Sequence, residues 1–160
     1  MDRSTKSFLK ALDSLRLAKT KKDRRDLLTI ALLPKSDRYL SFEAKLRILD
    51  ANPNAKELGL LRKIWEVSEE TSWEWPVLGA RLASRYLDLG QASIASDISS
   101  RILMKDSRHP EVRKTLVLSL ARLGKRQEAW DRARENGGRI PAAASAYDDL
   151  VRSLRREFER

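Results

Sequence analysis

The chain of 160 residues contains no cysteine, a single histidine, six glycines and five prolines. Without cysteine it has no disulfide, no thiol nucleophile and no cysteine zinc site, and a reducing compartment fits. His109 has no second histidine or cysteine with which to share a metal, and we expect it to serve in the turn before Pro110. The scarcity of glycine and proline, beside abundant Leu, Ala, Arg, Lys and Glu, favours helix throughout.

Long hydrophobic runs are also missing. The longest, residues 27–33, has seven residues and includes Thr29, far short of the ~20 needed to cross a bilayer. Residues 1–20 interleave Lys and Asp with Leu and lack the apolar core of a signal peptide. We therefore expect no membrane span and a cytoplasmic location.

Catalytic signatures are absent as well. The sequence has no Gly-rich phosphate loop, no nucleophile elbow and no zinc-binding helix motif. Acidic pairs such as Glu69-Glu70 are adjacent, so on a helix their side chains diverge by about a hundred degrees. The sequence predicts no enzyme, no catalytic residue, no metal site and no cofactor.

Charge is plentiful, with a net value of +10. Both ends of the chain are basic and residues 51–100 are slightly acidic, which suits an acidic protein, nucleic acid or an anionic surface as partner, or simply a solvated exterior. Asp23 and Asp26 interrupt the densest basic run, and no aromatic residue lies within it for base stacking. The candidate patch for an anionic partner comprises Lys19, Lys21, Lys22, Arg24 and Arg25.

Apolar periodicity, caps and breakers predict an all-α chain of about eight or nine helices with no strand. A basic turn is expected over residues 19–25, and Ser41 is expected to cap a helix. Asn54 followed by Glu57 has the spacing of a capping box. The expected helices are residues 4–19, about 23–33, 41 to near 52, 54 to about 67, 76–90, 91–104, 110–124, 126–135 and 141 to the C-terminus.

Two stretches of the chain match at an offset of 34 residues. Proline is expected at the first position of a helix and glycine in a left-handed cap at its end, and both recur at that offset. A period of 34 is typical of stacked helix pairs. The matching residues are Pro76, Leu82, Leu89, Gly90 and Ala95, which recur as Pro110, Leu116, Leu123, Gly124 and Ala129.

The region from Pro76 to about residue 138 resembles the tetratricopeptide-repeat family. Counted from Pro76, small Ala83 and Ala95, aromatic Tyr86 and the turn glycine Gly90 occupy the family's places. The resemblance implies a right-handed α-solenoid of antiparallel helix pairs. It divides the chain into an N-terminal helical segment, 1–72, with a degenerate repeat at 41–70, two units over 73–138 and a capping helix over 139–160.

The resemblance also implies that the first helix of each unit lines a concave face that contacts a ligand. Three cations there form a basic track suited to acidic side chains or a chain-terminal carboxylate. The asparagines of the family's peptide clamp are missing from both units. The residues implied are Arg81, Ser84, Asp88, Lys114, Thr115, Leu118 and Arg122.

Trp65, Trp73 and Trp75 lie within eleven residues. If exposed, Trp73 and Trp75 are an aromatic anchor for a partner; if buried, the cluster fills a joint between helices. The leading hypothesis is an adaptor that binds another protein, through a helix or an extended acidic segment. The alternatives are a nucleic-acid or anion-binding helical protein that uses the basic run, and a self-assembling subunit.

Overall fold

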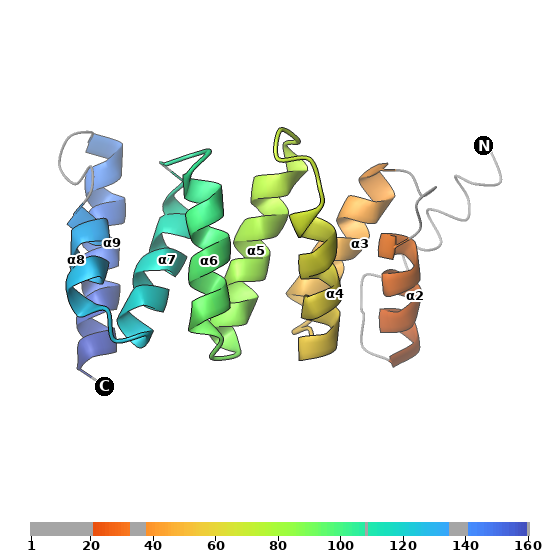
Figure 1. The fold of residues 1–160 in the computed structure, drawn as a ribbon, viewed down its shortest axis with the longest axis horizontal. Helices are drawn as coiled ribbons and strands as arrows, with labels where there is room; N and C mark the ends of the chain where they lie inside the picture. The colour runs from red at the N-terminus through yellow and green to blue at the C-terminus, as the bar shows by residue number, and fades with distance from the viewer. Residues whose placement is uncertain (1–20, 33–37, 108, 135–140, 160) are drawn as a thin grey trace. The chain divides into compact units, whose positions relative to one another are not determined.

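The computed structural model describes residues 21–32, 38–107, 109–134 and 141–159. The described chain is all-α, and no strand occurs in those ranges. The predicted helix at residues 4–19 lies outside them. The helices are α2 (Lys21–Leu32), α3 (Arg38–Asp50), α4 (Ala55–Glu66), α5 (Glu74–Asp88), α6 (Ala92–Leu103), α7 (Pro110–Arg122), α8 (Arg126–Arg134) and α9 (Pro141–Phe158) (Figure 1).

The chain divides into two compact units, Met1–Leu78 and Gly79–Arg160, and the division falls within α5. In the first unit α2 packs on α3, and α3 on α4. The sequence-based division at residues 72 and 138 stays a prediction. In the described part of the chain no helix has both the length and the apolar character needed to cross a membrane.

Of three features predicted at helix ends in the first unit, the structure confirms one and contradicts two. Asn54 Oδ1 accepts from the N–H of Glu57 at 2.8 Å, and Glu57 Oε1 accepts from the N–H of Asn54 at 3.0 Å, so the capping box is confirmed. The expected basic turn was wrong, because α2 already begins at Lys21. The expected cap at Ser41 was wrong too: α3 begins earlier, at Arg38, and Ser41 Oγ donates to the carbonyl of Ala31 in α2.

The core of the first unit consists of the apolar faces of α2, α3 and α4 with the start of α5. Because a helix buries residues three or four apart, each of these helices contributes one stripe. The largest fully buried side chains here are those of Trp75, Ile48 and three leucines, Leu27, Leu49 and Leu58. The buried apolar residues are Leu27, Ala31, Phe42, Ala44, Ile48, Leu49, Leu58, Leu61, Trp65, Trp75 and Leu78.

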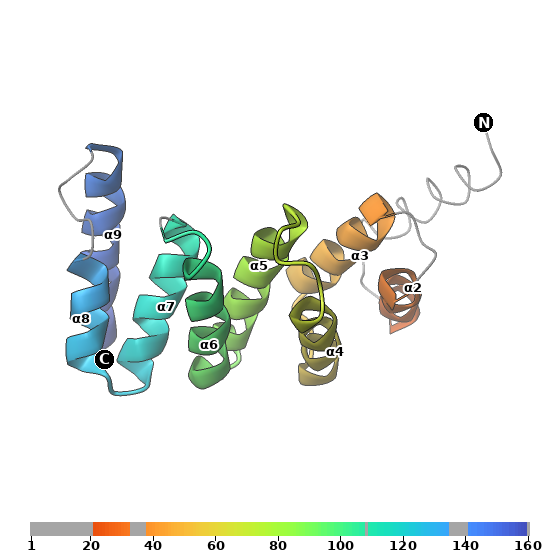
Figure 2. The ribbon, with the colours of Figure 1, turned by 45° about the horizontal axis from the view of Figure 1, so that its top comes forward.

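In the second unit α7 is the central helix. It packs against α6, α8 and α9, and α8 also packs against α9 (Figures 1 and 2). Burial on several sides leaves α7 only a narrow exposed stripe. The core cluster it shares with α8 and α9 comprises Leu116, Val117, Leu120, Ala129, Ala133, Leu150 and Leu154.

The turns after α5 and α7 have the same backbone geometry. Gly90 and Gly124 adopt φ of 76° and 79°, the left-handed region in which glycine has no steric penalty. The turn hydrogen bonds repeat at the offset of 34: N–H of Gly90 to the carbonyl of Leu87 matches N–H of Gly124 to that of Ala121. The backbone N–H groups of residues 89, 91 and 95 donate three further hydrogen bonds, and those of residues 123, 125 and 129 donate the three equivalent ones.

Proline begins only one of the two matching helices. Pro110 is the first residue of α7, and His109 caps it by accepting the N–H of Val112 on Nδ1, so the turn role of His109 is confirmed. Pro76, predicted at the first position, is the third residue of α5, which begins at Glu74. This is tolerated because the first four N–H groups of a helix have no intrahelical partner, and Ser72 Oγ accepts the N–H of Glu74.

Candidate interaction surfaces

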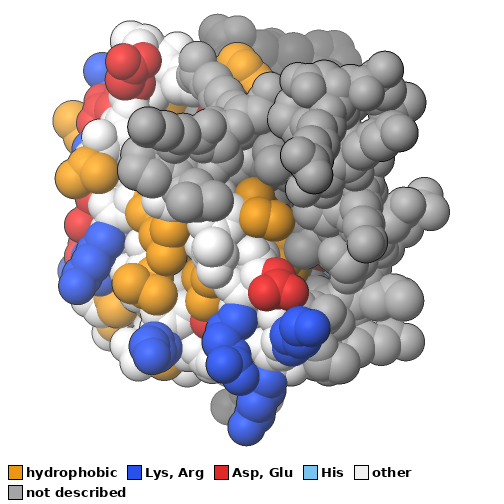
Figure 3. All heavy atoms as spheres, turned by 90° about the vertical axis from the view of Figure 1, so that its right-hand side faces the viewer, with side chains coloured by type: hydrophobic (Ala, Val, Ile, Leu, Met, Phe, Trp, Pro, Cys, Tyr) orange, Lys and Arg blue, Asp and Glu red, His pale blue; other side chains and the backbone are white. Residues whose placement is uncertain are grey.

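The basic run on α2 is partly exposed. Lys21, Lys22 and Arg25 are exposed, whereas Lys19 lies outside the described residues. Seen from the side on which α2 lies in Figure 1, Lys and Arg side chains gather along one edge beside hydrophobic side chains (Figure 3). Exposed Asp26 directly follows the run and weakens its positive field.

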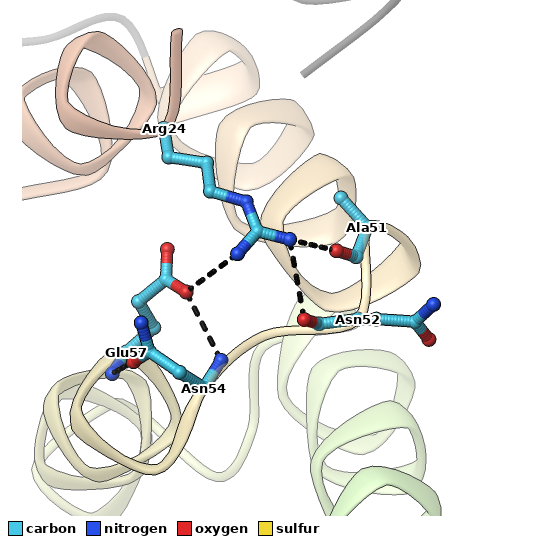
Figure 4. Close-up of polar contacts among 5 residues, drawn as sticks. All are labelled: Arg24, Ala51, Asn52, Asn54 and Glu57. Carbon is cyan, nitrogen blue, oxygen red and sulfur yellow. Dashed lines mark hydrogen bonds and ion pairs between the residues drawn. The ribbon is translucent and has the colours of Figure 1, made fainter. Parts of the chain in front are cut away.

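The side chain of Arg24 makes contacts within the chain (Figure 4). Its guanidinium reaches the turn between α3 and α4, where Nη2 donates to the carbonyls of Ala51 and Asn52 and Nη1 pairs with Glu57 at 3.4 Å. These carbonyls follow the end of α3, where a helix leaves acceptors without intrahelical donors. The assignment of Arg24 to a patch for anions stays a prediction, and the structure adds that an intramolecular site already holds part of its charge.

On α5, the residues implied by the family resemblance differ in exposure. Arg81 and Asp88 are exposed and Ser84 is half-buried. The carboxylate of Asp88 accepts from Arg85 one turn earlier at 3.3 Å. An exposed pair at this spacing contributes only about 0.3–0.5 kcal/mol, so Asp88 remains able to exchange partners.

On α7 the implied residues divide into available and unavailable groups. Lys114 is exposed and Leu118 half-buried, but Thr115 is buried and its hydroxyl donates to the carbonyl of Glu111 at 3.1 Å. Thr115 was therefore wrong as a partner-binding residue. The physical reason is that three helices pack against α7. The repeat position that is exposed on α5, at Arg81, is therefore buried on α7, at Thr115.

Arg122 is also engaged within the second unit. Its Nη1 donates to the carbonyl of Leu87, near the end of α5, at 3.0 Å, and its Nε pairs with Glu157 in α9 at 3.0 Å. The basic track therefore retains two exposed cations, Arg81 and Lys114. Arg122 instead joins α5, α7 and α9.

In the tryptophan cluster, Trp65 and Trp75 are buried and Trp73 is exposed. Trp65 and Trp75 are each 2% exposed and stack with ring centroids 4.6 Å apart, and the indole N–H of Trp65 donates to the carbonyl of Trp75. Trp75 as an exposed anchor was therefore wrong; it fills the joint between α4 and α5. Trp73 is 60% exposed, and its ring makes an edge-to-face contact with that of Phe42, with ring centroids 4.8 Å apart.

A cavity of about 370 Å³ lies beside this stack, at the junction of α4 and α5. Burial lowers the pKa of the Lys45 ammonium, and the nearby carboxylate of Glu74 partly offsets this effect. Lys45 was not predicted as a site residue, because the lining of the cavity comes from separate stretches of the chain. The lining residues are Lys45, Trp65, Val67, Ser68, Glu69, Ser72, Glu74, Trp75 and Leu78.

Comparison of the chain with protein-family models, curated proteins and solved structures finds no match in any of the three. Among the described residues, no group of three or more His, Asp or Glu side chains is placed to hold a metal ion.

Proposed function

We propose that the chain is a non-enzymatic adaptor, built of antiparallel helix pairs of the tetratricopeptide type, that acts in the cytoplasm. It binds an acidic segment of another protein across the exposed stripes of α5 and α7. Arg81 and Lys114 supply the cations, and Ser84 and Leu118 supply the polar and apolar contacts between them.

The observation that carries this proposal is the repeated turn. The same hydrogen bonds and the same left-handed glycine recur 34 residues apart, so α5 and α7 enter their turns in equivalent ways. Arg122 then links the end of α5 to α7 directly. Two equivalent helices linked by such a hydrogen bond present residues at regular intervals, which suits recognition of an extended segment.

The test is partner capture with charge reversal. The chain carrying Arg81→Glu and Lys114→Glu is compared with the wild type in affinity capture from host extract, with captured proteins quantified by mass spectrometry. A matched control carries Lys56→Glu and Lys63→Glu, two exposed lysines on α4, and so has the same net charge. Circular dichroism checks that all three chains stay helical.

The expected result is that the partner recovered by the wild type is reduced about tenfold or more for the Arg81 and Lys114 variant and retained by the control, because like charges now face the acidic segment. Equal capture by both variants removes the α5–α7 surface from the proposal. Equal loss from both shows that net charge alone governs capture, and contradicts it as well.

A further inference from the structure

The cavity between α4 and α5 in the first unit has the size of a ligand site. Its volume of about 370 Å³ lies within the range of small-molecule sites, roughly 300–1,000 Å³. At about 30 Å³ for each water molecule it holds roughly a dozen waters, which is close to the number of heavy atoms in an amino acid with a large side chain. The cavity therefore has room for one small organic molecule.

One part of the lining is apolar. Trp65 cannot offer its N–H to a ligand, because that group already donates to the carbonyl of Trp75 at 2.8 Å. Leu78 adds a buried apolar wall, and Val67, 85% exposed, adds an uncovered one. An apolar group bound here would remove Val67 from water, which is favourable in proportion to the area covered.

The other part of the lining carries charges of both signs. Lys45, Glu69 and Glu74 all line the cavity, and the charge of Glu74 acts on Lys45. Desolvation disfavours the charged form of Lys45 more than Glu74 favours it, so the ammonium has less compensation than it has in water. A ligand carboxylate would supply that compensation, and the two glutamates would favour a ligand cation.

We propose that this cavity binds a free α-amino acid with an apolar side chain. The ligand carboxylate pairs with Lys45, the ligand ammonium lies between Glu69 and Glu74, and the ligand side chain packs against Trp65, Val67 and Leu78. The site lies in the first unit and is independent of the α5–α7 surface in the second.

The mixed charge of the lining selects this class over simpler ones. A plain anion would meet Lys45 but be repelled by two carboxylates, and a plain amine would meet the carboxylates but compete with Lys45 for Glu74. A zwitterion satisfies both. Polar lining groups left without a partner reject an analogue that lacks the matching charge, so each charge of the ligand contributes to selectivity.

The experiment uses the full chain, isothermal titration calorimetry and tryptophan emission, with L-phenylalanine as probe. Two blocked forms accompany it: N-acetyl-L-phenylalanine, which lacks the ammonium, and L-phenylalaninamide, which lacks the carboxylate. We expect L-phenylalanine to bind and to change the emission of the tryptophans in the cavity wall, and each blocked form to bind about tenfold more weakly.

Variants then assign the contacts. Lys45→Met should weaken L-phenylalanine about tenfold while leaving L-phenylalaninamide unchanged, because only the former carries the carboxylate. Lys63→Met, an exposed site on α4, is the control and should change neither. If millimolar L-phenylalanine gives neither heat nor an emission change, or if both blocked forms bind as well as the free amino acid, the proposal is overturned. These ligand comparisons need no variant, so they remain decisive if Lys45→Met does not fold.

Discussion

Replacing Arg24 with alanine removes three contacts at once. The guanidinium is the donor to two carbonyls after α3 and the ion-pair partner of Glu57. The side chain of Glu57 is 6% exposed and that of Arg24 is 31% exposed, so the pair is largely shielded on one side and partly open to solvent on the other. After the substitution, Glu57 keeps only the N–H of Asn54 as a hydrogen-bond donor among the contacts of this network.

The expected loss of stability lies between two limits. Removing one partner of a fully buried ion pair costs about 3–5 kcal/mol, whereas an exposed pair contributes at most about 1 kcal/mol. Hydrogen bonds that involve a charged group contribute about 1.5–3 kcal/mol. Since Arg24 is partly screened and Glu57 retains one donor, we expect Arg24→Ala to lower the free energy of unfolding of the first unit by about 2–3 kcal/mol.

The assay is urea unfolding followed by circular dichroism, with amide hydrogen exchange to localise the effect. Because the chain has two compact units, a single unfolding transition is not assumed, and exchange in peptides of α3 and α4 reports the first unit directly. The matched control is Arg25→Ala, the neighbouring exposed arginine, for which we expect a change within about 0.5 kcal/mol. Equal effects of the two substitutions would refute the reasoning.

Three further predictions concern single positions. Gly90→Ala should lower the free energy of unfolding by about 1 kcal/mol, because a side chain is strained at φ 76° although nothing lies within 4 Å of the added carbon. Gly59→Ala inside α4, where the added carbon also meets nothing within 4 Å, should raise it by about 0.5–1 kcal/mol, and urea unfolding measures both changes. Ser99→Ala should stabilise the fold by about 1 kcal/mol, because this buried hydroxyl has no hydrogen-bond partner in the described residues. Ser119→Ala should destabilise the fold by a similar amount, because Ser119 Oγ donates to the carbonyl of Thr115 at 2.6 Å. A higher melting temperature for Ser119→Ala than for Ser99→Ala would contradict both expectations. Lys45 binds its proton less tightly in the folded chain than in the unfolded chain. Its contribution to stability should therefore be constant below its lowered pKa and rise with pH from there to its ordinary pKa of 10.5. Unfolding at a series of pH values should show a smaller rise for Lys45→Met than for the wild type.

The sequence predicted local structure well where one residue and its near neighbours decide the geometry. The capping box at Asn54, the start of α7 at Pro110 and the left-handed turns at Gly90 and Gly124 each depend on contacts within about five residues. The start of α3 was missed because Ser41 instead bonds across to α2. That bond depends on packing between helices, which periodicity does not contain.

The candidate sites were predicted less well, because the type of a side chain does not say what lies within its reach. Arg24 looked like its neighbour Arg25, and only the turn after α3 distinguishes them. Thr115 occupies the repeat place of Arg81, but a covered helix buries it. The cavity around Lys45 combines residues from three segments, so no single stretch of sequence carries its pattern.

The bridge made by Arg122 has a consequence for the order in which the second unit opens. One guanidinium holds a carbonyl near the end of α5 and a carboxylate of α9, so loosening α9 also removes a restraint on α5. A terminal helix without such a link frays on its own. Here, the last turns of α5, α7 and α9 should exchange their amide hydrogens as one cooperative group, and Arg122→Ala should let α9 exchange ahead of the other two.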